Sequence, residues 1–236
     1  MKKTAVLFDL DGTLLPMDQD IFVKEYFGRL CRKLAPYGYQ SDQLVKALWK
    51  STGDMIANMT DRTNEEVFWD SFCSILGDHV KEDMPLFQEF YLNEFKEVRI
   101  SCGYTPEARD IVEFCRENHL RTILATNPIF PHEATFERIQ WAGLDNDLFE
   151  YITTYENSTS TKPNTRYYEE LLEKLNLKPE ECIMVGNDAE EDGAASIAGI
   201  DLFLLDGCLI NSHGKDLSDI PHGNFGDLKD FIRKHV

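Results

Sequence analysis

The sequence predicts an α/β protein whose core is a doubly wound parallel sheet of five strands, with an all-α domain inserted into it. Five short apolar runs, rich in Val, Ile, Leu and Phe and bounded by polar residues, have the pattern of strands buried on both faces. Helical patterns separate the last four runs, and this alternation is typical of a parallel sheet. The predicted strands are Ala5–Phe8, Thr122–Ala125, Tyr151–Thr154, Cys182–Val185 and Leu202–Leu205.

Amphipathic helices are predicted between the later strands, where apolar residues recur at helical spacing. They span Pro106–Glu117, His132–Trp141, Arg166–Leu175 and Asp188–Ala198. Two polar stretches, Asn157–Thr161 and Asn211–Gly223, are predicted as irregular loops, and the first looks flexible.

The interval after the first strand breaks the alternation. It contains no predicted strand, but apolar residues recur there at helical spacing, as in the series Phe22, Tyr26, Leu30 and Leu34. A helical insert at this place predicts a small separate domain over one end of the sheet. We therefore expect a core formed by residues 1–14 and 99–236 and a helical cap formed by residues 15–98.

Composition argues against several classes of partner. The chain has 236 residues and a formal net charge of −18, whereas proteins that bind nucleic acid or anionic membranes need clustered Lys and Arg. No apolar run approaches the roughly 18 residues of a membrane span, and the N-terminal run ends at Asp9, too early for a signal peptide. The six cysteines are scattered without metal-ligand spacing, which predicts free thiols in the cytoplasm. No feature of the sequence indicates an oligomeric state.

Two carboxylates directly follow the first predicted strand. Asp9 and Asp11 are two residues apart in extended backbone, so both can face one ligand, and Gly12 permits the turn that follows. At an effective dielectric of 20, two such charges 4 Å apart repel by roughly 4 kcal/mol. A metal cation removes that repulsion; alternatively, one carboxyl stays protonated and acts as an acid.

Three further polar clusters follow other strands. Thr126 and Asn127 offer a hydroxyl and backbone N–H groups to a phosphoryl oxygen, Lys162 offers a positive charge, and the run 186–192 offers carboxylates to a hard cation such as Mg²⁺. Each of these alone is compatible with a turn, a solvated lysine or an acidic helix start. In an open parallel sheet, however, loops at the carboxyl ends of the strands converge on one ligand site.

Taken in order, these clusters resemble the motifs of the haloacid dehalogenase superfamily of phosphohydrolases. The resemblance covers the whole chain: DLDGT, a helical insert similar to a C1-type cap, then ATN, KP and VGNDAEED. It implies a Rossmann-like core and a phosphatase. By this resemblance Asp9 is the nucleophile that becomes phosphorylated, and Asp11 is the general acid and then the base. Thr126, Asn127 and Lys162 correspond to the phosphate-binding positions, with Thr126 and Lys162 counted among the catalytic residues.

The resemblance also implies a Mg²⁺ ion held by Asp9, the main-chain carbonyl of Asp11 and Asp188. The physical argument agrees, because a carboxylate attacks a dianionic phosphate ester poorly until a cation neutralises both. Lys162 offsets further negative charge in the transition state.

The fourth motif departs from the family pattern, which has Asp directly after the glycine. A rigid alignment places Asn187 and Glu191 at the two acidic positions, whereas a shift by one residue uses Asp188 and Asp192. We favour the shift because it restores a carboxylate ligand and puts both residues on one helical face. Asp192 is then the residue that supports the metal site, with Glu191 as the alternative.

The leading functional prediction is a Mg²⁺-dependent phosphatase acting on a small phosphorylated metabolite through an aspartyl phosphate. A phosphomutase is the main alternative, since the same motifs serve both reactions. A dehalogenase is disfavoured because those enzymes lack the second aspartate that Asp11 supplies, and a non-catalytic binding protein because every expected catalytic position is filled. The cap should grip the substrate; the candidates there are Tyr26, Arg29, Arg32 and Trp69.

Overall fold

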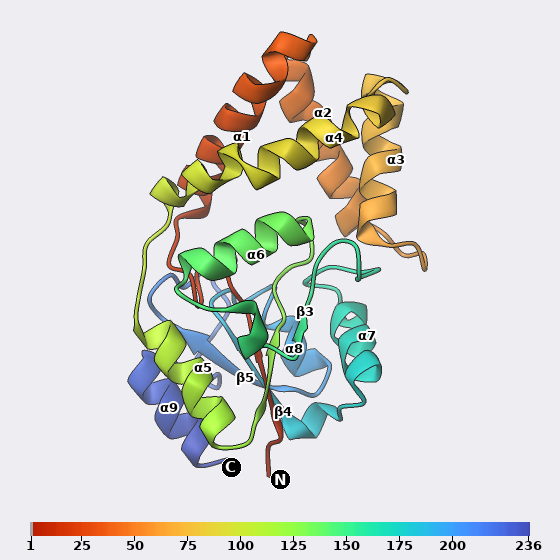
Figure 1. The fold of residues 1–236 in the computed structure, drawn as a ribbon. Coiled ribbons are helices and arrows are strands. Elements are labelled where there is room, and N and C mark those ends of the chain that lie inside the picture. Colours follow the sequence, from red (N-terminus) through yellow and green to blue (C-terminus); the bar gives the residue numbers. More distant parts are fainter. Residues whose placement is uncertain (1) are drawn as a thin grey trace.

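A parallel sheet forms the centre of the computed structural model, which describes residues 2–236 (Figure 1). Its order is β3-β2-β1-β4-β5-β6, with every pair parallel, so the predicted α/β class and doubly wound sheet are confirmed. The strands are β1 (Ala5–Phe8), β2 (Arg121–Leu124), β3 (Tyr151–Ile152), β4 (Cys182–Gly186), β5 (Asp201–Leu205) and β6 (His222–Gly223).

The sequence predicts five strands, and the sheet formed within residues 2–236 has six. The additional strand β6 lies at the end of the stretch 211–223, which the sequence predicts to be an irregular loop. It has only two residues and pairs with Leu204 and Leu205 of β5. A pairing this short carries no apolar pattern, so nothing in the sequence indicates it.

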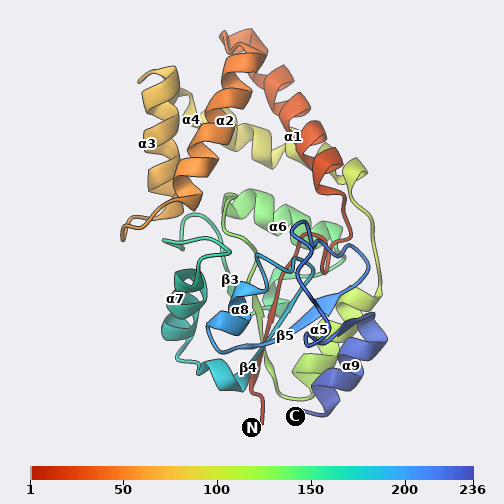
Figure 2. The same ribbon diagram turned by 180° about the vertical axis from the view of Figure 1, so that it is seen from behind.

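Helices cover both faces of the sheet. The face that carries Val6 and Phe8 packs against α5 (Glu107–Glu117), α6 (His132–Trp141) and α9 (Phe225–Arg233). The opposite face, with Ala5 and Leu7, packs against α7 (Thr165–Leu175) and α8 (Ala194–Ile197). Figures 1 and 2 show α5 and α9 on one side of the strands and α7 on the other.

The predicted helix 188–198 is wrong in its first half. Only Ala194–Ile197 is helical; Asp188 makes an isolated bridge with Ile210, and residues 189–193 form turns. The reason is local: the side chains of Asp188 and Asp192 accept hydrogen bonds from nearby main-chain N–H groups and so replace the helical pattern.

Four helices form a layer beyond the carboxyl end of the sheet, above α6 in both views (Figures 1 and 2). They are α1 (Gln19–Leu34), α2 (Ser41–Ile56), α3 (Asn64–Leu76) and α4 (Val80–Leu92), and we call them the cap. Short 3₁₀ helices follow α1 at Ala35–Tyr37 and α4 at Glu94–Ser101. The exact domain boundaries predicted at residues 14/15 and 98/99 stay a prediction.

Main-chain hydrogen bonds at two places are among the contacts that attach the cap to the core. At the connectors, the N–H of Gly103 donates to the carbonyl of Pro16 over 2.7 Å. At the start of α3, Asn64 is fully buried; its main-chain N–H donates to the carbonyl of Ser158 (2.8 Å) and its side chain to that of Ser160 (3.1 Å). The stretch 157–161 is therefore not the flexible surface loop that its polarity predicts, because the cap covers it.

None of the helices within residues 2–236 is long and apolar enough to cross a lipid bilayer.

Candidate active site

Three neighbouring strands at the centre of the sheet place polar side chains at one edge. Phe8 of β1 lies level with Leu124 of β2 and Val185 of β4, so the chain leaves all three strands at the same height. Asp9, Thr126 and Asn187 follow there and line one cavity of about 190 Å³ beneath the cap. Other predicted site residues also line the cavity, namely Asp11, Asn127, Asp188 and Asp192.

Lys162 is the positive centre of the site. It is fully buried, and its Nζ lies 2.9 Å from Oδ1 of Asp9 and 2.6 Å from Oδ1 of Asp192. Burial by itself lowers the pKa of Lys162, but the charges of Asp192 and Asp9 raise it well above its ordinary value. For Asp9, burial dominates and raises the pKa to about 7, despite the attraction of Lys162. Asp9 therefore needs further positive charge to stay fully ionised at neutral pH.

Asp192 ties Lys162 to the turn after β4. Its Oδ2 accepts hydrogen bonds from the main-chain N–H groups of Asn187 (2.9 Å) and Asp188 (3.0 Å). This approach requires the glycine at position 186, because a Cβ there would lie 2.1 Å from Oδ2 of Asp192. Of the two alternatives in the fourth motif, the structure thus brings Asp192 to the lysine.

Glu191 lies elsewhere in the site. Its Oε2 accepts a hydrogen bond from Nδ2 of Asn127 over 2.9 Å, and Asn127 in turn accepts from the main-chain N–H of Lys162 over 3.2 Å. Burial raises the pKa of Glu191 to about 7. The Glu191 carboxyl lines the cavity, and within residues 2–236 it makes no hydrogen bond or ion pair with Lys162 or Asp9.

Asp188 and Asn187 both reach the cavity, but in different ways. Oδ1 of Asp188 accepts from the main-chain N–H groups of residues 190 (2.7 Å) and 191 (2.9 Å), and its side chain is only partly buried. Asn187 is buried and packs under the loop after β1: its Oδ1 lies 2.9 Å from Oγ1 of Thr13, which lies 3.1 Å from Oδ2 of Asp9. Sequence reasoning missed Thr13 as part of this network.

Asp11 forms an ion pair with Arg138 of α6, which sequence reasoning also missed. Arg138 is 1 % exposed, and its guanidinium lies over the ring of Phe130, 4.5 Å from the centroid. The second oxygen of Asp11, Oδ1, is buried without a hydrogen-bond partner. A signal for Arg138 existed: it follows Ala134 by four residues on the buried face of α6, where a charged residue must have a partner.

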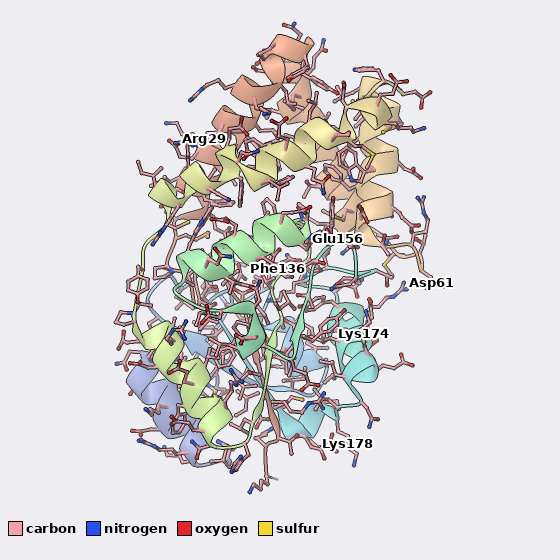
Figure 3. All side chains as sticks on the ribbon, viewed as in Figure 1. Arg29, Asp61, Phe136, Glu156, Lys174 and Lys178 are labelled. Atoms are coloured by element: carbon pink, nitrogen blue, oxygen red, sulfur yellow. The ribbon has the colours of Figure 1, made fainter. Side chains whose placement is uncertain are left out.

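The four cap candidates divide into two pairs. Tyr26 and Trp69 line the cavity. Arg29 forms ion pairs with Glu25 and with Glu97, and Figure 3 shows it on α1, away from the sheet. Neither Arg29 nor the exposed Arg32 lines the cavity.

A cluster of one histidine and two glutamates lies at the start of α6. Nδ1 of His132 lies 2.9 Å from Oε1 of Glu156 and 3.4 Å from Oε2 of Glu133. Figure 3 labels Glu156 near the boundary of the cap and the core. Within residues 2–236 these three are the only His, Cys, Asp or Glu side chains that offer three atoms within 4.8 Å of one another. The predicted Mg²⁺ set differs in kind, since one of its ligands is a main-chain carbonyl.

The fold and the site together define an α/β enzyme whose polar groups come from the carboxyl ends of its central strands. Residues 3–199 match the family model of the haloacid dehalogenase-like hydrolases, and the chain belongs to this family. The family predicted from the sequence motifs is therefore confirmed.

Individual relatives are distant. The chain is 24 % identical over 202 residues to the pyrophosphatase PpaX of Bacillus cereus, covering 84 % of this chain and 81 % of PpaX. A 2-haloacid dehalogenase from Pseudomonas syringae has a similar structure, with a TM-score of 0.64, 19 % identity and coverage of 99 % and 100 % of the two chains. A predicted phosphoglycolate phosphatase from Haemophilus somnus has a TM-score of 0.61, 18 % identity and 98 % coverage of both. The two structural likenesses concern the fold.

Proposed function

We propose that the protein is a Mg²⁺-dependent phosphatase that hydrolyses a small phosphate monoester through an aspartyl phosphate on Asp9. One observation carries the proposal: a buried aspartate after the central strand lies against a buried lysine, in the same cavity as Asp11 and Thr126. The distant similarity to a pyrophosphatase supports phosphoryl chemistry. The net charge of −18 supports a small substrate rather than a nucleic acid or a membrane, and the six free cysteines fit the cytoplasm.

Asp9 is the nucleophile in this proposal. It is 6 % exposed and lies between Lys162 and Thr13, which fix the direction of its carboxylate. Attack by Oδ on phosphorus transfers the phosphoryl group and releases the alcohol; water then cleaves the acyl phosphate. Lys162 holds positive charge beside the group that receives the phosphoryl, while Thr126 and Asn127 line the cavity where its oxygens are bound.

Asp11 is the general acid for the leaving alcohol and then the base for water. Arg138 holds one of its oxygens, so the buried and unpartnered Oδ1 is the atom free to exchange a proton. Arg138 does not line the cavity, and we assign it the role of positioning Asp11.

The residues present fit a divalent cation. Asp9 and Asp188 are hard oxygen ligands that line one cavity. Burial raises the pKa of Asp9 to about 7 despite the nearby Lys162, so a second cation would favour its ionised form. In our proposal Mg²⁺ is held by Asp9, Asp188 and the main-chain carbonyl of Asp11, with Asp192 fixing the turn. When bound, the ion neutralises the nucleophile and the phosphoryl oxygens.

Hydrolysis of 4-nitrophenyl phosphate, with Mg²⁺ or with EDTA, tests the proposal. We expect Mg²⁺-dependent turnover that Asp9→Asn reduces by at least about 10³-fold while circular dichroism stays unchanged. The exposed Asp219→Asn is the matched control and should keep full activity. Turnover in the Asp9 variant would contradict the nucleophile assignment, and no turnover by folded wild-type protein would contradict the phosphatase.

The choice between Asp188 and Asn187 has its own test. Asp188→Ala should raise the Mg²⁺ concentration at half-maximal activity far more than Asn187→Ala, because only the former removes a charged ligand. The reverse result would favour the rigid alignment of the fourth motif.

The phosphomutase is the second candidate. A mutase re-seats a doubly phosphorylated intermediate, so it needs cations in the cap for the distal phosphate. Within residues 2–236 no Lys or Arg lines the cavity, which favours hydrolysis.

A further inference from the structure

The cavity above Asp9 has two chemically different ends. The carboxylates lie on the core, at the floor. On the cap side, each of the helices α1–α4 contributes an aromatic side chain, and loops of the core add others. Among them are Tyr26, Trp49, Trp69, Phe87, Phe130 and Tyr155.

The polar atoms of these rings are largely engaged with one another. The hydroxyls of Tyr26 and Tyr91 are 2.6 Å apart, and Nε1 of Trp69 donates to the hydroxyl of Tyr155 over 3.3 Å. Burial raises the pKa of Tyr26 to about 12, so its hydroxyl stays neutral. The cap therefore presents ring faces and edges to the cavity more than hydrogen-bonding groups.

The cavity lining contains no positive side chain in the described residues 2–236. The two nearby cations are both paired within the core, Lys162 with Asp9 and Asp192, and Arg138 with Asp11. A second anionic group on the substrate, such as a carboxylate or another phosphate, would lie among aromatic rings without a partner. Burial of an unpaired anion is strongly unfavourable.

We propose that the substrate is the phosphate monoester of a small apolar alcohol, preferably one that carries an aromatic ring. This inference rests on the proposed function, because the phosphoryl group must lie at Asp9 for its leaving group to reach the cap. The volume limits the leaving group to about one ring: an apolar cavity of about 150 Å³ accommodates benzene, and this cavity measures about 190 Å³ with its polar floor included. Pyrophosphate and sugar bisphosphates do not match such a lining.

Trp49 is the residue that we expect to contact the apolar part of the substrate. It lines the cavity from α2 but is 55 % exposed, and its ring lies edge-on to Phe27 with the centroids 5.4 Å apart. A large ring left exposed beside an apolar cavity gains contact area when a ligand covers it. Tyr37, which is 53 % exposed on the cap but does not line the cavity, offers a matched control.

The test uses three non-hydrolysable ligands in the presence of Mg²⁺: benzylphosphonate, 2-hydroxyethylphosphonate and phosphonoacetate. Calorimetry should give Kd values that rise in this order, with benzylphosphonate at least tenfold tighter than phosphonoacetate. Equal affinities or the reverse order would overturn the proposal. Hydrolysis of benzyl phosphate is measured separately, so that selective binding without turnover refutes the phosphatase and not the ligand class.

Two pairs of variants locate the effect. Trp49→Ala should weaken benzylphosphonate by about 3- to 10-fold and leave 2-hydroxyethylphosphonate unchanged, whereas Tyr37→Ala changes neither. Equal weakening of both ligands by Trp49→Ala would indicate a structural role and contradict the proposal. Gln19→Arg introduces a cation into the lining and should tighten phosphonoacetate; Gln43→Arg, exposed on α2 and outside the lining, should not. If Gln19→Arg and Gln43→Arg changed the affinity for phosphonoacetate equally, that result would also contradict the proposal.

Discussion

Asp192→Asn and Glu191→Gln should have opposite effects on stability, which distinguishes the two acidic residues of the fourth motif. The buried carboxylate of Asp192 contacts Nζ of Lys162 through one oxygen and two main-chain N–H groups through the other. An asparagine has one acceptor oxygen and an NH₂ group, so it can satisfy only one of these sides. The change therefore deprives either Lys162 of one of its two carboxylate partners or the turn after β4 of its acceptor.

The magnitude follows from the burial of the pair. Loss of one partner of a buried ion pair costs about 3–5 kcal/mol. Because Lys162 keeps Asp9 at 2.9 Å, we expect the lower end of this range. With a urea m-value of about 3 kcal/mol per M, a loss of about 3 kcal/mol lowers the unfolding midpoint by about 1 M.

Glu191→Gln should act in the opposite direction. The pKa of Glu191 is raised from 4.5 to about 7, so between these pH values the folded state holds a proton that the unfolded state has released. The wild type therefore loses stability as the pH rises from about 4.5 to 7. At pH 8 the neutral glutamine should make the variant more stable than the wild type by up to about 3 kcal/mol, at 1.36 kcal/mol per pKa unit. Urea unfolding at pH 8 in EDTA measures both variants. A loss under 1 kcal/mol for Asp192→Asn, or shifts of the same sign, would refute the reasoning.

Three other outcomes are expected. In EDTA, the free energy of unfolding of the wild type should fall between about pH 4 and pH 7, since the pKa of Asp9 is raised to about 7. In urea titrations, Asp9→Asn should remove up to about 4 kcal/mol of that fall. An unchanged dependence of stability on pH in the variant would contradict the burial argument. Arg138→Met leaves the partly buried Asp11 without its charged partner and should lower the free energy of unfolding by about 2 kcal/mol. Arg138→Lys should recover part of this loss, and a neutral effect of Arg138→Met would mean that the ion pair contributes nothing. Asn64→Ala removes side-chain hydrogen bonds that join the cap to the core and should lower the free energy of unfolding by about 2 kcal/mol. It should also speed amide hydrogen exchange in residues 157–161. Unchanged protection there would mean that Asn64 does not hold this stretch to the cap.

The central strands and the groups that follow them could be predicted from the sequence. Runs such as Ala5–Phe8 are short and apolar at every position, which is typical of a strand buried on both faces. Parallel strands expose their carboxyl ends at one edge, so Asp9, Thr126 and the fourth cluster had to converge there. The register of the sheet then places them level with one another.

Features that depend on distant contacts could not be predicted. The stretch 157–161 is polar and looks like a mobile loop, but the start of α3 covers it and satisfies its carbonyl groups. Helix α9 was not predicted, although the side chain of Asn224 caps its start, and helix α8 is shorter than its apolar spacing indicates because Asp192 hydrogen-bonds the turn before it. At residues 157–161 a tertiary partner outweighs the local pattern, whereas the hydrogen bonds that shorten α8 are local.

The class of fold, the helical insert and the aspartate at the end of the first strand can all be predicted from the residues alone, because apolar periodicity and motif order are local properties. The tertiary structure was needed to show which acidic residue meets Lys162 and that Arg138 holds Asp11. It was also needed to show that, within residues 2–236, the cap lines the site with aromatic rings and with no Lys or Arg. Those facts depend on which side chains share a buried volume. In that volume a charge must find a partner, and the partner can lie more than a hundred residues away in the chain.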